Sequence, residues 1–207
     1  MTWSGRLVRP AYLWLGGWLV ALLLDYPLAQ ALLRKPHADW GVLRRSYVDT
    51  AHILGQGWML LVIGGLIWFA GALMSRVDWQ RVARWFAGAL LITGFWAQAI
   101  KHVVGRPRPS QLAHGAWLPI GPTFQPSFDS FPSGHAMTVF AAVPLLCALW
   151  PRGRWFVIVA ATLVALGRVA GGSHYLSDLV VGAGMGLAIG RYLTARWRAE
   201  VESTDAL

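Results

Sequence analysis

The sequence predicts an all-α membrane protein that folds as a six-transmembrane-helix bundle. Hydrophobic residues make up 56% of its 207 positions, and charged residues make up only 13%. The apolar residues occur in blocks and not at the spacing of an amphipathic helix on a soluble protein. Six blocks approach the length of about 20 residues with which a helix crosses a bilayer core of roughly 30 Å.

The first block is expected to be a helix and not a cleaved signal peptide, because no small-residue cleavage site closes it. The fourth and fifth blocks are short, but a tight turn at residues 151–154 separates them, so they count as spans. No polar linker divides the chain, and residues 1–207 are expected to form a single domain. In order, the blocks run from Tyr12 to Ala31, His52 to Met74, Ala83 to Val104, Gly134 to Trp150, Trp155 to Ala170 and Leu179 to Thr194.

An even number of spans places both termini on one side of the membrane and the first, third and fifth loops on the other. Several polar residues lie at span ends next to those loops: Lys101, residues 132–135, Arg168, His174 and Asp178. They are therefore expected to share one membrane face.

The Lys and Arg residues indicate which face this is. Ten of the eighteen fall on the side of the termini, and setting aside Lys101, Arg108 and Arg168 as candidate site residues leaves five on the other side. Cytoplasmic loops carry the excess of positive charge. The termini are thus expected to be cytoplasmic, and the candidate site is expected at the outer, periplasmic or extracellular, interface.

The first polar stretch, residues 101–109, contains Lys101 and two Arg-Pro pairs. A lysine at a helix end can extend its amine to the interface, and the prolines favour an extended chain beyond it. The stretch can therefore present cations, although an ordinary basic flank of a membrane helix has the same composition. Spacing alone does not choose between Arg106 and Arg108.

The second stretch, Pro132-Ser133-Gly134-His135, precedes the fourth block. Ser133 is expected to cap the helix, which places Gly134 and His135 in its first turn. Free N–H groups and the helix dipole make such a terminus suitable for binding phosphate. The alternative is a capped helix start with an interfacial histidine.

In the third stretch, His174 and Asp178 are four residues apart and are expected to lie on one helical face. A carboxylate bonded to one imidazole nitrogen fixes the tautomer and leaves the other nitrogen free to attack. Nearby cations would repel a metal ion and attract phosphate, so no metal site is expected.

These three stretches resemble the three signature motifs of the type-2 phosphatidic acid phosphatase superfamily. The matching residues are Lys101 with Arg108-Pro109, then Pro132-Ser133-Gly134-His135, then Arg168 with His174 and Asp178, so that the core motifs span residues 101–178. The resemblance selects Arg108 over Arg106. It departs at Gly167, where the family commonly has serine, so a contact of that serine must be absent or supplied by a neighbour such as Ser173.

The resemblance implies a metal-independent lipid phosphatase without a cofactor, in a bacterial inner membrane. It implies that His174 attacks phosphorus, that Asp178 orients His174, and that His135 protonates the leaving oxygen and later activates water. The phosphoryl oxygens would be held by Lys101, Arg108, Ser133, Gly134 and Arg168.

The substrate is expected to be a membrane lipid with a terminal phosphate or pyrophosphate: undecaprenyl pyrophosphate, phosphatidylglycerophosphate, phosphatidic acid or a lipid A phosphate. A lipid-to-lipid phosphotransferase with the same site and a non-catalytic lipid-binding scaffold are the alternatives. No nucleic-acid partner is expected, because topology explains most of the net charge of +9. The protein is expected to be a monomer or a homodimer.

Other features have no place in the motifs. Asp25 is a carboxylate in the first block, and hence either functional or a mark of the interface. The small residues Gly182, Gly186 and Gly190 suit close helix packing, inside the bundle or in a homodimer. A basic loop is expected to lie on anionic lipid or to bind a headgroup; it contains Arg34, Lys35, Arg44 and Arg45 with Trp40 and Tyr47. No role is assigned to His37, His52, His102 and His114.

Overall fold

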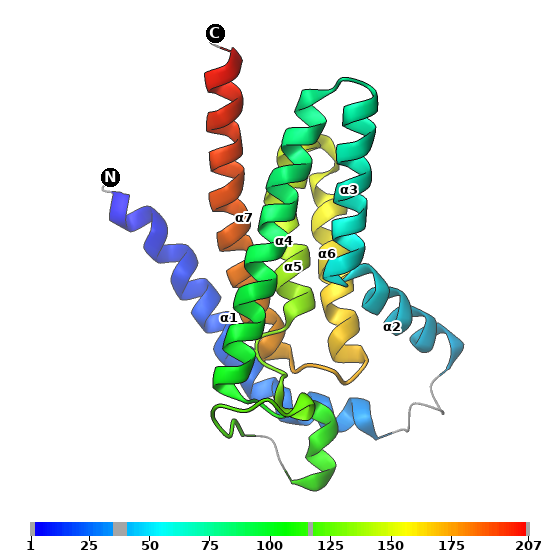
Figure 1. Cartoon of the computed structure of the whole chain (residues 1–207). Coiled ribbons are helices and arrows are strands. Elements are labelled where there is room, and N and C mark those ends of the chain that lie inside the picture. The colour runs from blue at the N-terminus through cyan, green and yellow to red at the C-terminus, as the bar shows by residue number, and fades with distance from the viewer. Residues whose placement is uncertain (1–2, 35–40, 116–117, 206–207) are drawn as a thin grey trace.

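The computed structural model describes residues 3–34, 41–115 and 118–205, and these residues form helices and no strand (Figure 1). Within these described residues, three short 3₁₀ helices lie in the connections: η2 (Pro109–His114), η3 (Pro126–Phe128) and η4 (Pro151–Gly153). The α-helices are α1 (Trp3–Leu33), α2 (Val42–Leu54), α3 (Gly57–Leu73), α4 (Val77–Val104), α5 (Gly134–Leu149), α6 (Arg154–Ala170) and α7 (Leu176–Asp205).

Four helical segments of the described chain are long and apolar enough to cross a membrane: Tyr12–Leu33, Val77–Leu112, Pro151–Ala170 and Leu176–Ser203. They match the first, third, fifth and sixth expected spans. The second and fourth expected spans correspond to shorter apolar helices, Leu60–Leu73 and Gly134–Leu149.

Helices α3 to α7 run alongside one another in Figure 1, whereas α1 and α2 run obliquely to them. Both termini lie at one end of the molecule, whereas the connections from α4 to α5 and from α6 to α7 lie at the opposite end (Figure 1). The relation expected from an even number of spans, with the termini and the polar stretches at opposite ends, is therefore present in the fold.

The expectation of one continuous second span from His52 to Met74 is wrong. The helix stops at Leu54, Gly55 caps it, and α3 begins only at Gly57. The residues before the break form a separate amphipathic helix, in which Val48 and Ala51 are buried against α6 while Arg45 and Asp49 are exposed. His52 consequently lies in the last turn of α2 and not inside a span.

Helix α5 lies at the centre and packs against α4, α6 and α7. The glycines of α7 permit the closest of these contacts, because a Cβ atom at Gly182, Gly186 or Gly190 would overlap a backbone carbonyl oxygen of α5. The expected use of this small-residue face for packing inside the bundle is confirmed. The carbonyls belong, in order, to Ser133, Met137 and Ala141.

Candidate active site

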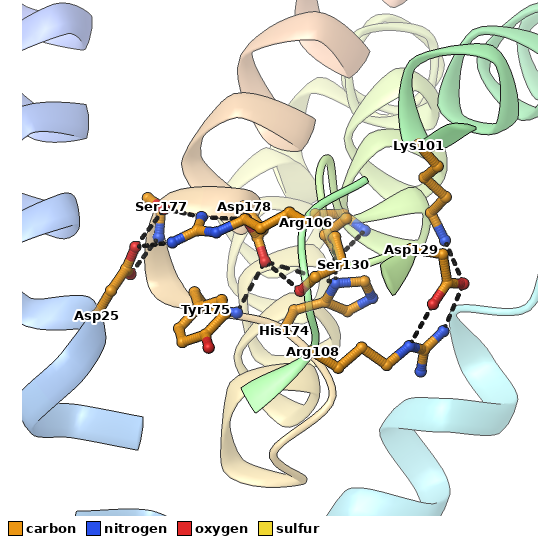
Figure 2. A network of polar contacts seen from close by, with 12 residues as sticks. Asp25, Lys101, Arg106, Arg108, Asp129, Ser130, His174, Tyr175, Ser177 and Asp178 are labelled. Atoms are coloured by element: carbon orange, nitrogen blue, oxygen red, sulfur yellow. Dashed lines mark hydrogen bonds and ion pairs between the residues drawn. The ribbon is translucent and has the colours of Figure 1, made fainter. Parts of the chain in front are cut away.

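The candidate residues meet at the end of the bundle opposite the termini, where α4 and α6 finish and α5 and α7 begin (Figures 1 and 2). Backbone hydrogen bonds fix these ends to one another. The Ser133 amide donates to the Asp178 carbonyl over 3.1 Å, and the Ser173 amide donates to the Arg168 carbonyl over 3.0 Å. Segments that are far apart in the sequence therefore form one polar cluster.

His174 lies in the connection before α7, and its side chain is almost completely buried. Its Nδ1 lies 2.7 Å from the backbone carbonyl oxygen of Ser130. Because a carbonyl can only accept a hydrogen bond, Nδ1 carries the proton and Nε2 keeps a free lone pair. Burial, and then the positive charges of Lys101, Arg168 and Arg108, hold the pKa of His174 well below its usual value of 6.5. The imidazole is thus neutral at pH 7.

The sequence predicts a direct bond between Asp178 and His174, and the structure corrects this. The Asp178 carboxylate is 3.9 Å from Nδ1, too far for a hydrogen bond. It instead accepts from the Ser130 hydroxyl over 2.6 Å and from the Tyr175 amide over 2.9 Å. Asp178 therefore holds the segment whose carbonyl orients His174, and it acts on the imidazole through Ser130.

Arg106 and Arg108 have different partners, which resolves the ambiguity of the first stretch (Figure 2). Arg106 is buried between two carboxylates, at 2.5 Å from Asp178 and 2.9 Å from Asp25. Its guanidinium also lies 4.3 Å from the centre of the Tyr175 ring. Arg106 is a buried structural cation behind the cluster.

Asp25, a carboxylate of α1, is part of the same buried network. It accepts from Arg106 and from the backbone amide of Ser177, each over 2.9 Å. The amide belongs to the first turn of α7, so α1 is anchored to the start of the helix that carries Asp178. Asp25 reaches the cluster through Arg106 and does not contact His174.

Lys101 and Arg108 face a carboxylate that the sequence analysis did not single out (Figure 2). Asp129 accepts from Nε and Nη2 of Arg108 over 2.6 and 2.7 Å, and it lies 3.6 Å from Nζ of Lys101. Burial raises the pKa of Asp129, but the Arg108 hydrogen bonds and the charges of Arg108 and Lys101 outweigh it, so the pKa is below its usual value. Asp129 is ionised and forms ion pairs with both cations.

Helix α5 begins as expected from the second stretch. The Ser133 hydroxyl accepts from the Ala136 amide over 3.4 Å, and Gly134 and His135 form the first turn. The Ser133 side chain is buried in this capping position. Within the described part of the chain, Nε2 of His135 is buried and has no hydrogen-bond partner.

Arg168 is buried at the end of α6, and its Nη1 lies 2.9 Å from Nδ1 of His52. The His52 ring also stacks on His135, with ring centroids 5.3 Å apart and planes at 22°. His52 belongs to α2, and no motif in the sequence connects it with these residues, which lie more than 80 positions away. The break before α3 is what brings it to the cluster.

The basic loop contributes to packing where the structure describes it. Arg44 donates to the carbonyls of Leu32 and Ala170 over 3.1 and 2.8 Å, and Tyr47 donates to the Leu163 carbonyl over 2.7 Å. These bonds dock α2 on its neighbours. Lys35 and Trp40 lie outside the described residues.

The chemistry of the cluster favours an oxyanion. Lys101, Arg108 and Arg168 surround an imidazole that is itself uncharged, and the α5 N-terminus adds free N–H groups. The described residues contain no group of three or more His, Cys, Asp or Glu side chains arranged to hold a metal ion. The arrangement can bind a tetrahedral anion and direct the Nε2 lone pair of His174 toward it.

Comparison with known proteins agrees with this chemistry. A family model described as the PAP2 superfamily matches residues 82–201. The chain is 30% identical to a lipid A 1-phosphatase of Rhizobium etli over 81% of this chain and 75% of that protein. It is 34% identical to a decaprenylphosphoryl-5-phosphoribose phosphatase of Mycobacterium tuberculosis over 65% of this chain and 68% of that protein.

A solved structure supports the fold. The crystal structure of Aquifex aeolicus LpxE superposes with a TM-score of 0.62 at 21% sequence identity, over 82% of this chain and 94% of that chain. At this identity the likeness concerns the arrangement of helices alone.

Proposed function

Since the chain belongs to the PAP2 superfamily, we propose that it removes a terminal phosphate from a membrane lipid through a phosphohistidine on His174, without a metal ion. The chain is a phosphoric monoester hydrolase that acts on membrane lipids. The observation that supports the proposed mechanism best is the bond from His174 Nδ1 to the Ser130 carbonyl, 2.7 Å long. It leaves Nε2 unprotonated among three cations.

In the first step, Nε2 of His174 attacks phosphorus, and the bond from phosphorus to the leaving oxygen breaks. His135 donates its proton to that oxygen, so the lipid leaves as an alcohol or, from a pyrophosphate, as a monophosphate. A bound phosphate favours the protonated form of His135, because it brings negative charge to a ring that otherwise faces cations. The Asp178 carboxylate orients His174 through Ser130.

In the second step, His135 takes a proton from water, and the hydroxide attacks the phosphohistidine. The N–P bond breaks, inorganic phosphate leaves, and His174 regains its lone pair. Through both steps, charge on the phosphoryl oxygens is held by Lys101, Arg108 and Arg168 and by the Gly134 amide, while Ser133 keeps that helix terminus capped.

The substrate that we place first is a lipid A-type phosphate, because relatives named as a lipid A 1-phosphatase match most of the chain. A polyprenyl-linked sugar phosphate comes second, after the mycobacterial relative. Undecaprenyl pyrophosphate, phosphatidylglycerophosphate and phosphatidic acid carry the same terminal phosphate. Transfer to a second lipid in place of water is the alternative that uses the same residues.

We place the protein in a bacterial inner membrane as a single domain, either a monomer or a homodimer, with cytoplasmic termini and the site on the periplasmic or outer side. The positive charge on the side of the termini supports this orientation. Modification of cysteines introduced at residue 110 and at residue 203, with a reagent that does not cross membranes, would test it. Labelling of residue 203 in intact spheroplasts would contradict it.

The decisive experiment measures phosphate release by the purified protein from a panel of these lipids, with His174→Ala as the control. We expect His174→Ala to be inactive and His135→Ala to be slower by roughly 10² to 10⁴. Near-normal release by His174→Ala would exclude the mechanism. Labelled phosphate recovered on a second lipid would identify a phosphotransferase, and an intact substrate bound but never hydrolysed would identify a scaffold.

A further inference from the structure

His52 holds two of the proposed site residues at once. Its Nδ1 lies 2.9 Å from Nη1 of Arg168, and its ring stacks on His135 at a centroid distance of 5.3 Å. The Arg168 contact thus holds Nδ1, and the ring plane lies against His135.

We propose that His52 is a positioning residue for phosphoryl transfer: its neutral imidazole aims the Arg168 guanidinium and supports the His135 ring. The proposal rests on the function proposed above, and it deepens the account of the same site. It assigns a task to α2, the amphipathic helix that hydropathy alone merges with a membrane span.

The protonation state of His52 follows from its partner. A guanidinium can only donate, so Nδ1 of His52 must accept and the ring must be neutral for the bond to exist. Burial, and then the charge of Arg168, lower the pKa of His52, while Asp49 of the same helix opposes them. His135 of α5 is the other titratable group against the ring. At neutral pH the acceptor is available.

Arg168 needs such a partner. Its guanidinium is buried, and in the described part of the chain its Nε has no hydrogen bond. The bond to His52 therefore limits rotation of a side chain whose task is to meet phosphoryl oxygens in a defined direction. Without this bond, Arg168 would keep its charge, but its guanidinium would no longer be held in one orientation.

Gly167 explains how α2 comes so close. A Cβ atom at this position would overlap the Ala51 methyl group, so the serine that commonly stands there in the family would push α2 away from α6. Gly171 and Gly55 also permit close packing. A Cβ at Gly171 would lie 2.8 Å from a Val48 methyl group, and a Cβ at Gly55 would lie 2.5 Å from the His135 ring. Gly167 thus leaves the space that α2 occupies, and α2 carries His52.

Two substitutions at residue 52 separate the acceptor from the ring. His52→Phe keeps a ring against His135 but has no acceptor, whereas His52→Asn keeps an oxygen close to the place of Nδ1 and loses the ring. With purified protein and a lipid phosphate, we expect His52→Phe to lower kcat/KM about tenfold or more, the usual worth of a hydrogen bond to a charged group. We expect His52→Asn to stay within about threefold of the wild type. Inhibition by orthovanadate should weaken in the same order.

The second arm tests the spacing. Gly167→Ser should lower kcat/KM as His52→Phe does, and adding Ala51→Gly, which removes the overlapping methyl group, should restore it. Tyr47→Phe is the matched control, since it deletes another bond between α2 and α6 without touching His52, and we expect less than about a twofold effect.

Each outcome has one meaning. An inactive His174→Ala with a His52→Phe that equals the wild type would overturn the positioning role alone. Equal losses in His52→Phe, His52→Asn and Tyr47→Phe, in step with lower melting temperatures, would show that α2 is only a scaffold and would also overturn it. A fully active His174→Ala would instead overturn the proposed function.

Discussion

Replacing Arg106 by methionine should destabilise the protein more than replacing Lys101, Arg108 or Arg168. Arg106 is 6% exposed, and its partners Asp25 and Asp178 are 2% and 0% exposed. Methionine leaves two buried carboxylates without their cation, and breaking a buried pair in this way costs about 3–5 kcal/mol. For a protein of this size that corresponds to a loss of roughly 6–20 °C in melting temperature.

The assay is thermal unfolding of the purified variant in detergent, followed by the fluorescence of the thirteen tryptophans. Arg108→Met is the matched control, because its partner Asp129 has a side chain that is 23% exposed and keeps Lys101 as a second cation at 3.6 Å. We expect Arg108→Met to melt near the wild type and to lose activity. If Arg106→Met melted within about 2 °C of the wild type, the buried network would not be a stabilising element.

The remaining predictions concern the site itself. Asp129→Asn should lower KM and strengthen inhibition by inorganic phosphate about tenfold, because the carboxylate competes for Lys101 and Arg108; weaker inhibition would show that Asp129 assists binding. The pKa of His174 is well below 6.5, so His174 should cause no loss of kcat/KM between pH 6.5 and 8 in a pH profile. The same shift should reduce thermal stability as pH falls below about 6.5, since the unfolded chain then binds a proton that the folded chain excludes. Hydrolysis should persist in excess EDTA, and a strict need for added divalent metal would contradict the proposed chemistry.

Parts of this fold follow from local sequence rules. The Ser133 cap follows from a capping residue before an apolar run, and the opposite placement of termini and polar stretches follows from counting spans. Such predictions need only periodicity and the chemistry of helix ends. The span count alone predicts that Lys101, Ser133 and His174 lie at one end of the bundle.

Other parts depend on contacts that leave no local signal. The partner of His174 is a backbone carbonyl, which every residue possesses, so Ser130 could not be singled out. The break at Gly55 leaves no signal in hydropathy, because the polar face of α2 is shorter than the window over which hydropathy is averaged. Arg106 and Arg108 are two positions apart in an extended segment, and their side chains point in different directions where the chain turns. Only the fold shows that Arg106 is the one that pairs with Asp25.

The glycine face of α7 has a consequence for geometry at the site. Gly182, Gly186 and Gly190 each contact a backbone carbonyl at or near the start of α5 or within it. The contacts recur every four residues on both helices, so they fix the register in which α5 and α7 pack. A shift by one such repeat of four residues would displace α5 by about 6 Å along its axis. The distance between the N-terminus of α5 and His174, which precedes α7, is thereby set from within the bundle. A methyl group added at one of these glycines would therefore shift the N-terminus of α5 relative to His174, several helical turns away.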